Sequence, residues 1–140
     1  MITKSSKYAV RAILYIAKHA TVDHKIGSKH IAEKLDIPAP FLAKTLQELS
    51  RKEIVTSVKG PNGGFYLTGE NRNKTLYDII AAIDNIHKFD ECYLGQLECN
   101  DINPCVIHNI FKPFKNKLIQ RLQTKTIIEI AKENSFEEFV

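Results

Sequence analysis

A glycine-rich turn between two short apolar runs constrains the fold of this chain most. Residues 54–58 and 65–67 have the composition of β-strands, and Gly60-Pro61-Asn62-Gly63-Gly64 lies between them. Two such runs around a Pro/Asn/Gly turn predict a β-hairpin. The residues before it have helical periodicity. We therefore predict a mainly α fold with a small β-hairpin wing, in the element order of a winged helix-turn-helix.

Three helices are predicted before the hairpin, each from one stripe of apolar residues. The first covers residues 6–19. The second has Ser28 as its N-cap and ends before Pro38, because a residue that precedes proline is disfavoured in the α conformation. The third starts at about Pro40, since proline suits a first helical position. The three stripes are Ala9, Ala12, Ile13, Ile16 and Ala17; Ile31, Ala32 and Leu35; and Phe41, Leu42, Leu46 and Leu49.

The second half of the chain predicts helices on either side of a long loop. Thr75 and Asp78 have the spacing of a capping box, which starts a fourth helix. Residues 85–104 have no clear period, and a loop of this length in a compact domain is usually functional or disordered. A long amphipathic helix follows, with Pro113 near its start or at a bend. A second capping box, formed by Thr126 and Glu129, predicts a last helix over residues 127–134.

The composition indicates a globular protein of one domain. The chain has 140 residues, of which 44% are hydrophobic and 26% are charged. These values are ordinary for a globular chain with its own core. No run approaches the ~20 apolar residues of a membrane helix, and the first residues lack the apolar core of a signal peptide. We therefore expect a cytoplasmic protein with no membrane partner.

Basic residues are concentrated in the first half of the chain. Residues 1–70 contain 11 Lys and Arg against 6 Asp and Glu, whereas residues 71–140 contain 9 against 10. This asymmetry fits contact with phosphates, although a solvated lysine-rich surface would give the same balance.

The predicted helix-turn-helix supplies candidate contacts to double-stranded DNA. Its second helix would enter the major groove by its N-terminal end, where Lys44 and Thr45 suit base edges or phosphates and Ala43 suits a thymine methyl. Lys59 at the hairpin tip could reach a minor groove or a phosphate. The module could instead dock onto a protein. The candidates are Lys4, Lys7, Arg11, Lys29, Ala39, Pro40, Phe41, Ala43, Lys44, Thr45, Lys59, Gly60, Asn62 and Gly63.

All three cysteines of the chain, Cys92, Cys99 and Cys105, lie in the predicted loop, and His108 follows the last by three residues. In a cytoplasmic protein clustered cysteines are more often metal ligands or redox groups than structural disulfides. Thiolates and an imidazole can hold iron or zinc. A thiol/disulfide switch and inert cysteines are the alternatives. For His108 the alternative is a solvent-facing histidine, and His87 is a reserve ligand.

The sequence contains no pattern typical of an enzyme. Residues 60–64 are not followed by Lys-Ser or Lys-Thr, so they do not form a phosphate-binding P-loop. Asp90, Glu91 and Glu98 lie near the cysteines, but their spacing fits no known loop for a hard metal. We therefore expect a protein that is not an enzyme.

The chain resembles the Rrf2 family of winged-helix transcription regulators, with its IscR-like and NsrR-like iron–sulfur sensors. The resemblance covers essentially the whole chain. It rests on residues 8–12 (Tyr-Ala-Val-Arg-Ala), on Phe41, Leu42, Leu46 and Leu49, on the wing sequence of residues 58–65, and on Cys92, Cys99, Cys105 and His108.

The resemblance implies a homodimeric regulator, expected to be a repressor, whose operator affinity depends on an iron–sulfur cluster. The signal would be redox state, iron–sulfur status or nitric oxide. A 2Fe–2S cluster on the three cysteines and His108 is favoured, and a 4Fe–4S cluster is possible. It also implies three parts of one compact unit: a DNA-binding domain (1–84), a cluster-binding loop (85–108), and a dimerisation helix (Ile110–Gln123) with the C-terminal helix (109–140).

The chain departs from the family pattern at three places. The gap between Cys92 and Cys99 is one residue longer than the family pattern. Lys59 stands where arginine is common in the wing, and lysine cannot make the planar two-pronged contact of arginine. Residues 5–11 contain no acid, whereas some NsrR-like members use an acidic residue of the first helix as the fourth ligand to a 4Fe–4S cluster.

Overall fold

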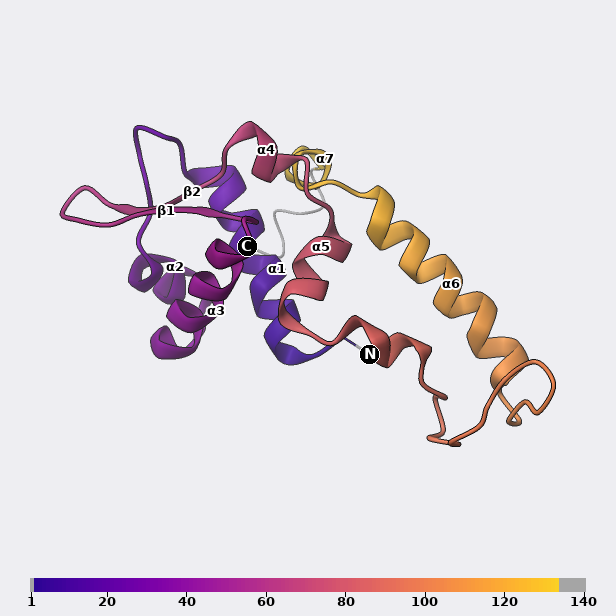
Figure 1. Cartoon of the computed structure of the whole chain (residues 1–140). Helices are drawn as coiled ribbons and strands as arrows, with labels where there is room; N and C mark the ends of the chain where they lie inside the picture. Colours follow the sequence, from indigo (N-terminus) through magenta and orange to yellow (C-terminus); the bar gives the residue numbers. More distant parts are fainter. Residues whose placement is uncertain (1, 134–140) are drawn as a thin grey trace.

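The computed structural model describes residues 2–133, which are mainly helical with one two-stranded antiparallel hairpin, as predicted (Figure 1). No helix among these residues has the length and apolar character needed to cross a membrane. The elements are α1 (Lys4–His19), α2 (Ser28–Leu35), α3 (Ala39–Arg51), β1 (Thr56–Val58), β2 (Gly64–Tyr66), α4 (Gly69–Arg72), α5 (Leu76–Ile83), the 3₁₀ helix η1 (Ile86–Asp90), α6 (His108–Thr124) and α7 (Ile127–Ala131).

Helix α1 lies at the centre of the core. Ala9, Ala12, Ile13 and Ile16 are completely buried, because their spacing places them on one stripe of the helix. The helix packs against α2, α3, α5 and α7. Thr3 caps its first turn by accepting a hydrogen bond from the backbone N–H of Ser6.

Helices α2 and α3 form the helix-turn-helix. The turn depends on Asp36, whose backbone is left-handed with φ of 54°, a conformation that Asp tolerates better than most residues. Two details differ from the prediction. Ser28 is the first helical residue and Gly27 is the N-cap, while α3 begins at Ala39, one residue before Pro40.

The hairpin is shorter than predicted, because Ile54 and Val55 are buried in the core before β1 begins. Its pairs are Thr56–Tyr66, Ser57–Phe65 and Val58–Gly64. At two positions of the turn a side chain would be too close to the backbone, which explains the glycines there. A Cβ on Gly63 would lie 2.1 Å from the carbonyl oxygen of Val58. A Cβ on Gly64, where φ is 144°, would lie 2.9 Å from the backbone of Ile26.

Four segments that follow the hairpin confirm or correct the prediction. Thr75 and Asp78 form the predicted capping box of α5. The predicted loop contains the helix η1, which forms where Phe89 packs into a cluster with Ile80 and Leu122. The short helix α4, with its own capping box, was not predicted. The last predicted helix is present from Ile127, but Asn134 lies outside the described residues.

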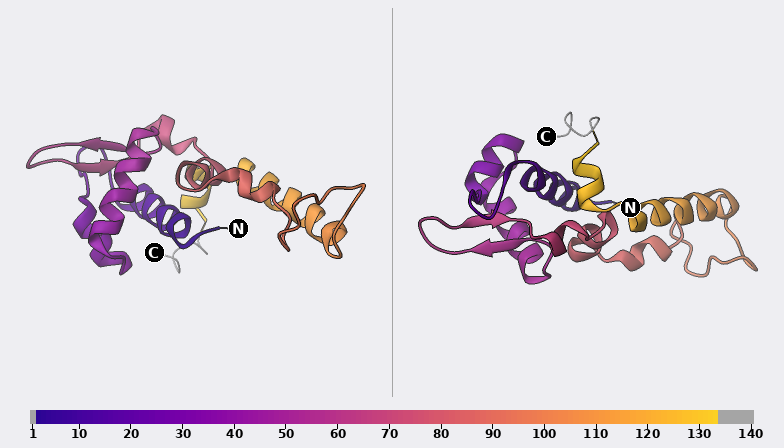
Figure 2. Two further views of the ribbon diagram at one scale, coloured as in Figure 1. Left: turned by 60° about the horizontal axis from the view of Figure 1, so that its bottom comes forward. Right: turned by 90° about the horizontal axis from the view of Figure 1, so that it is seen from above.

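Residues 85–124 form a projection that we call the arm. Helix α6 projects from the rest of the molecule. Its C-terminal end adjoins the body, and the cysteine loop lies at its N-terminal end, far from the body (Figures 1 and 2). The base of the arm is fixed by backbone bonds from Leu76 N–H to Lys125 and from Ile127 N–H to Lys74. Pro113 lies inside α6. We call the rest of the described chain, residues 2–84 and 125–133, the body.

Candidate metal centre and DNA-binding surface

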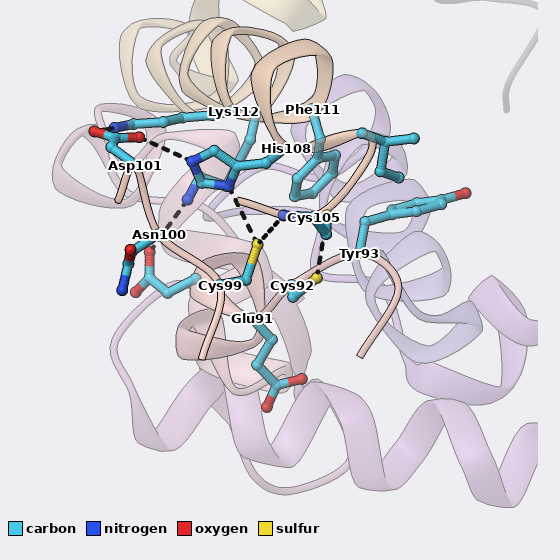
Figure 3. Close-up of a pocket in the computed structure, with 13 residues that line it drawn as sticks. Glu91, Cys92, Tyr93, Cys99, Asn100, Asp101, Cys105, His108, Phe111 and Lys112 are labelled. Atoms are coloured by element: carbon cyan, nitrogen blue, oxygen red, sulfur yellow. Dashed lines mark hydrogen bonds and ion pairs between the residues drawn. The ribbon is translucent and has the colours of Figure 1, made fainter. Parts of the chain in front are cut away.

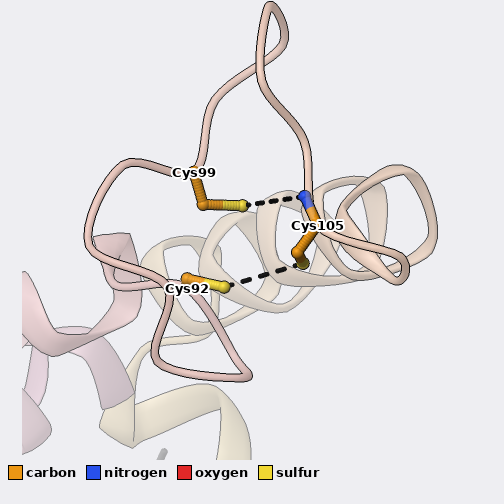
Figure 4. A group of neighbouring side chains, drawn as sticks. All are labelled: Cys92, Cys99 and Cys105. Carbon is orange, nitrogen blue, oxygen red and sulfur yellow. Dashed lines mark hydrogen bonds between the residues drawn. The ribbon is translucent and has the colours of Figure 1, made fainter.

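The three cysteines converge although the chain between them runs through an open loop (Figure 4). Their sulfur atoms all lie within 4.8 Å of one another. The Sγ atoms of Cys92 and Cys105 are 3.6 Å apart. The backbone N–H of Cys105 points at the sulfur of Cys99 over 3.4 Å. All three thiols are half-buried and unbridged, so three soft donors are available at one point.

His108, the first residue of α6, completes a second close pair of donor atoms. Its Nδ1 lies 3.4 Å from the sulfur of Cys99, and its Nε2 lies 2.8 Å from a carboxylate oxygen of Asp101 (Figure 3). The other oxygen of Asp101 accepts a bond from Lys112 at 2.6 Å. The imidazole is therefore directed at the cysteines from one side and held by a carboxylate from the other.

The pKa values of the Cys92 and Cys99 thiols are shifted in opposite directions. Burial by itself would raise the pKa of Cys92, but backbone hydrogen bonds from Gln96 and Leu94 outweigh it and lower the pKa to about 7. The backbone N–H of Cys105 acts to lower the pKa of Cys99, yet burial and the neighbouring thiols raise it overall. Cys92 is thus the most readily ionised of the pair, and a thiolate is the form that binds metals.

The cysteines open into a hollow of about 220 Å³ between the loop and the first turns of α6. Lys112 and Lys115 line it on the helix side and Asp90 and Glu91 on the loop side. The charges of both lysines are paired with Asp101 and Asp90. The pKa of Asp101 is held below its usual range by its hydrogen bonds to Lys112 and His108.

Helices α2 and α3 and the wing, which contain most of the predicted DNA contacts, lie at the opposite end of the molecule from the cysteines (Figure 1), whereas Lys4 and Lys7 lie at the start of α1, nearer the base of the arm. Lys4, Lys7, Lys29, Ala39, Pro40, Lys44, Lys59, Gly60 and Asn62 are exposed, and Ala43 and Gly63 are half-buried. The structure therefore leaves most of the predicted set accessible at the turn between α2 and α3 and at the wing.

Three of the proposed contact residues also have structural roles. Thr45 is buried and donates its hydroxyl hydrogen to the carbonyl of Phe41. Arg11 donates to the carbonyl of Leu35. Phe41, predicted to face the core, is 37% exposed and meets the ring of Tyr8 edge-on. The prediction that Phe41 is buried was wrong, because its ring lies against Tyr8 at the edge of the core, while the neighbouring Leu42 is buried.

Sequence reasoning missed Asp101 and Lys112 as neighbours of His108. One local signal existed, because His108 and Lys112 are four residues apart and so share a helix face. Asp101 reaches them only through the path of the loop, which periodicity does not describe.

Comparison with known proteins shows the family of this chain. Residues 2–133 match the sequence pattern of the family described as Rrf2, iron-dependent transcriptional regulator. The chain belongs to the Rrf2 family. It is therefore a DNA-binding transcriptional regulator with three clustered cysteines, and not an enzyme.

Relatives of this Rrf2 chain include both regulators and solved structures. An HTH-type transcriptional regulator from Aquifex aeolicus is 35% identical over 89% of this chain and 86% of its own length. The regulator IscR of Vibrio atlanticus is 27% identical over 95% and 76%. The structure of CymR, the global cysteine regulator of B. subtilis, has a TM-score of 0.74 at 18% identity, over 94% and 95%. IscR of T. potens has a TM-score of 0.72 at 23% identity, over 100% and 91%. These two structures support the winged-helix fold with a C-terminal helix.

Proposed function

We propose that this Rrf2 regulator binds its operator as a homodimer and that an iron–sulfur cluster on Cys92, Cys99, Cys105 and His108 sets the affinity. The convergence of three thiols within 4.8 Å beside the His108 imidazole carries the proposal. The expected role is repression, and the expected signal is redox state, iron–sulfur status or nitric oxide.

The donor atoms fall into two close pairs, an arrangement that could hold two irons as well as one ion. Two sulfurs at 2.3 Å from a single tetrahedral metal lie about 3.8 Å apart. The donors form two pairs near that spacing, Cys92 with Cys105 at 3.6 Å and Cys99 with His108 at 3.4 Å. Each iron of a 2Fe–2S cluster would take one pair. Residues 5–11 offer no acid as a fourth ligand of the 4Fe–4S kind.

Each residue of the proposed centre has a separate role. The bound cluster would supply one-electron chemistry and a group that oxidants or nitric oxide can remove. Cys92, Cys99 and Cys105 would hold the irons as thiolates. His108 would contribute a neutral donor in place of a fourth thiolate, which would remove one negative charge and raise the reduction potential. Lys112 and Lys115 line the hollow and pair with Asp101 and Asp90.

The exposed apolar face of the arm supports the homodimer. Ile110 is 76% exposed, Phe114 57% and Tyr93 65%, and together with Phe111 they line one open groove. A continuous apolar surface of this kind marks an interaction site. A second copy of α6 has the length and the matching apolar face to cover it, as the expected dimerisation helix.

The fixed base of the arm supports a lever mechanism. Backbone bonds join Leu76 to Lys125 and Ile127 to Lys74, while the cysteine loop meets the other end of α6. A change at the cluster would therefore turn α6 about its base and alter the distance between the recognition helices of the dimer. Two half-sites must lie about 34 Å apart, one DNA turn, so a small rotation changes operator affinity.

The test is anaerobic purification, followed by the visible spectrum and assays of iron and acid-labile sulfide. Brown protein with equal iron and sulfide, two of each per monomer, is the expected result. Cys99→Ala should lose the cluster and keep the far-ultraviolet circular dichroism of the wild type. Ile102→Ala is the matched control, because this side chain is 95% exposed in the same loop. Colourless wild-type protein after anaerobic reconstitution would contradict the proposal and leave zinc or thiol chemistry.

The dimer is tested separately by sedimentation. Phe114→Ser should increase the fraction of monomer at micromolar concentration. Val22→Ser, which changes a side chain that is 57% exposed on the body, is the control. Equal dimer fractions in both variants would contradict the assignment of the interface to α6.

A further inference from the structure

The two ring nitrogens of His108 have different partners. Nδ1 faces the sulfur of Cys99 at 3.4 Å, and Nε2 lies 2.8 Å from Asp101. A carboxylate can only accept a hydrogen bond, so Nε2 carries the proton and the lone pair of a neutral ring lies on Nδ1. The His108 side chain is only 14% exposed, which leaves it little room to turn.

We propose that Asp101 is the positioning residue of this centre: its carboxylate holds the Nε2–H of His108, so that Nδ1 is the nitrogen presented to the metal. This inference rests on the proposed function. It adds a residue outside the predicted ligand set and assigns the coordinating atom of the histidine.

Asp101 has a second partner that makes it suited to this role. Lys112 donates to its other oxygen at 2.6 Å, and Lys112 lies one helical turn after His108 on the same face of α6. The carboxylate thereby contacts two side chains that lie one turn apart on the same helix. A ligand held by an outer hydrogen bond keeps both its tautomer and its orientation.

The arm contains a second trio of the same residue types, which serves as an internal comparison. A carboxylate oxygen of Asp90 lies 3.9 Å from His87 Nδ1, and the other lies 3.7 Å from Lys115 Nζ; the His87 side chain is 85% exposed. His87 therefore lacks the close carboxylate contact and the burial of His108. An Asp–His–Lys set on the surface of the arm does not by itself create a positioned imidazole.

The experiment compares Asp101→Ala, Asp101→Asn and the control Asp23→Ala, which changes an exposed carboxylate of the body. Long-range proton–nitrogen correlation spectra of the metal-free proteins report the tautomer of His108. We expect the Nε2–H tautomer in the wild type and in Asp23→Ala, and a mixture of tautomers in Asp101→Ala. Asp101→Asn keeps one acceptor oxygen, so it should fall between them.

The second readout is anaerobic reconstitution with ferrous iron and sulfide. Asp101→Ala should need about 10- to 100-fold more iron for half-occupancy, the range for loss of an outer partner of a metal-bound histidine. Pulsed electron paramagnetic resonance of the reduced cluster measures its coupling to the nitrogen of His108. In Asp101→Ala this coupling should differ from that of the wild type.

The two hypotheses fail in different ways. A wild-type protein that takes up no iron contradicts the proposed function. An Asp101→Ala variant with the wild-type tautomer contradicts the positioning role, whether or not iron binds. A changed tautomer with wild-type iron affinity and nitrogen coupling also contradicts it, because the contact would then be only structural.

Discussion

Leu46 and Leu97 show how differently the body and the arm are built. Leu46 is 0% exposed in the core of the body, whereas Leu97 is 101% exposed at the end of the arm. Between residues 85 and 124 only Phe89 and Leu122 are buried. The body thus supplies its own core, while the arm has one small apolar cluster at its base. Under the function proposed above, the arm would gain two further partners, a metal centre and a second copy of the chain.

The largest effect should come from the core of the body. Leu46→Ala should reduce the free energy of unfolding by about 2–5 kcal/mol, because it removes buried methyl groups and leaves a cavity. Urea unfolding at one fixed protein concentration measures it, since the stability of a dimer depends on concentration. A loss below about 1 kcal/mol would mean that α3 is not part of a tightly packed core.

A smaller effect is expected where polar groups join two helices of the body. Asp84, which follows α5, accepts hydrogen bonds from the Thr3 hydroxyl at 2.7 Å and from the buried Ser6 hydroxyl at 2.6 Å. Asp84→Asn should cost about 1–2 kcal/mol at pH 7, because it weakens hydrogen bonds to a charged acceptor. Unfolding at two concentrations of salt distinguishes this loss from a change in distant charges.

The sign of the pH dependence follows from the same contacts. Burial acts to raise the pKa of Asp84, but the bonds from Ser6 and Thr3 lower it below its usual value of 3.8. The stabilisation is therefore complete above that value and is lost as the pH falls through the lower pKa of the folded protein. The difference between wild type and Asp84→Asn should shrink below pH 4. A difference that grows on acidification would contradict the assignment.

The body could be predicted from sequence because its signals are local. The Thr75–Asp78 capping box and the turn at Gly63 and Gly64 depend on residues a few positions apart. Helix α4 was missed, since its capping pair, Thr68 and Asn71, does not precede an apolar run. Signals of this kind specify helix ends, but they do not show which apolar side chain of a turn, such as Phe41, remains partly exposed at the edge of the core.

The arm could be predicted only in part, because its contacts are not local. The cysteines were identified as a group by their chemistry, and their convergence is confirmed by the 4.8 Å limit on their separations. Helix η1 was missed because Phe89 is buried by Ile80 and Leu122, which lie on other elements. The Asp101–His108 contact depends on the path of an irregular loop, for which neither period nor propensity gives a rule.

DNA affinity should depend on a lysine of the body and not on a lysine of the arm. Lys44 is exposed in the first turns of α3. Lys44→Ala should weaken operator binding about tenfold and lower the salt slope by about 1 for each protomer, because one phosphate contact is lost. Fluorescence anisotropy at several salt concentrations measures both. Lys117→Ala on α6 is the control, and equal slopes in the two variants would mean that α3 has been wrongly placed on the DNA.

The smallest effect should come from the same residue type that gives the largest. Leu97→Ala removes a side chain that is fully exposed to solvent. The free energy of unfolding should therefore change by less than about 0.5 kcal/mol. Cluster content and dimer fraction should also equal those of the wild type, because Leu97 lies outside both the cysteine hollow and the apolar groove. A loss of dimer in this variant would extend the proposed interface to the end of the loop. A loss of stability without a loss of dimer would instead mean that the arm supplies part of its own core, and the contrast between the two regions would then be wrong.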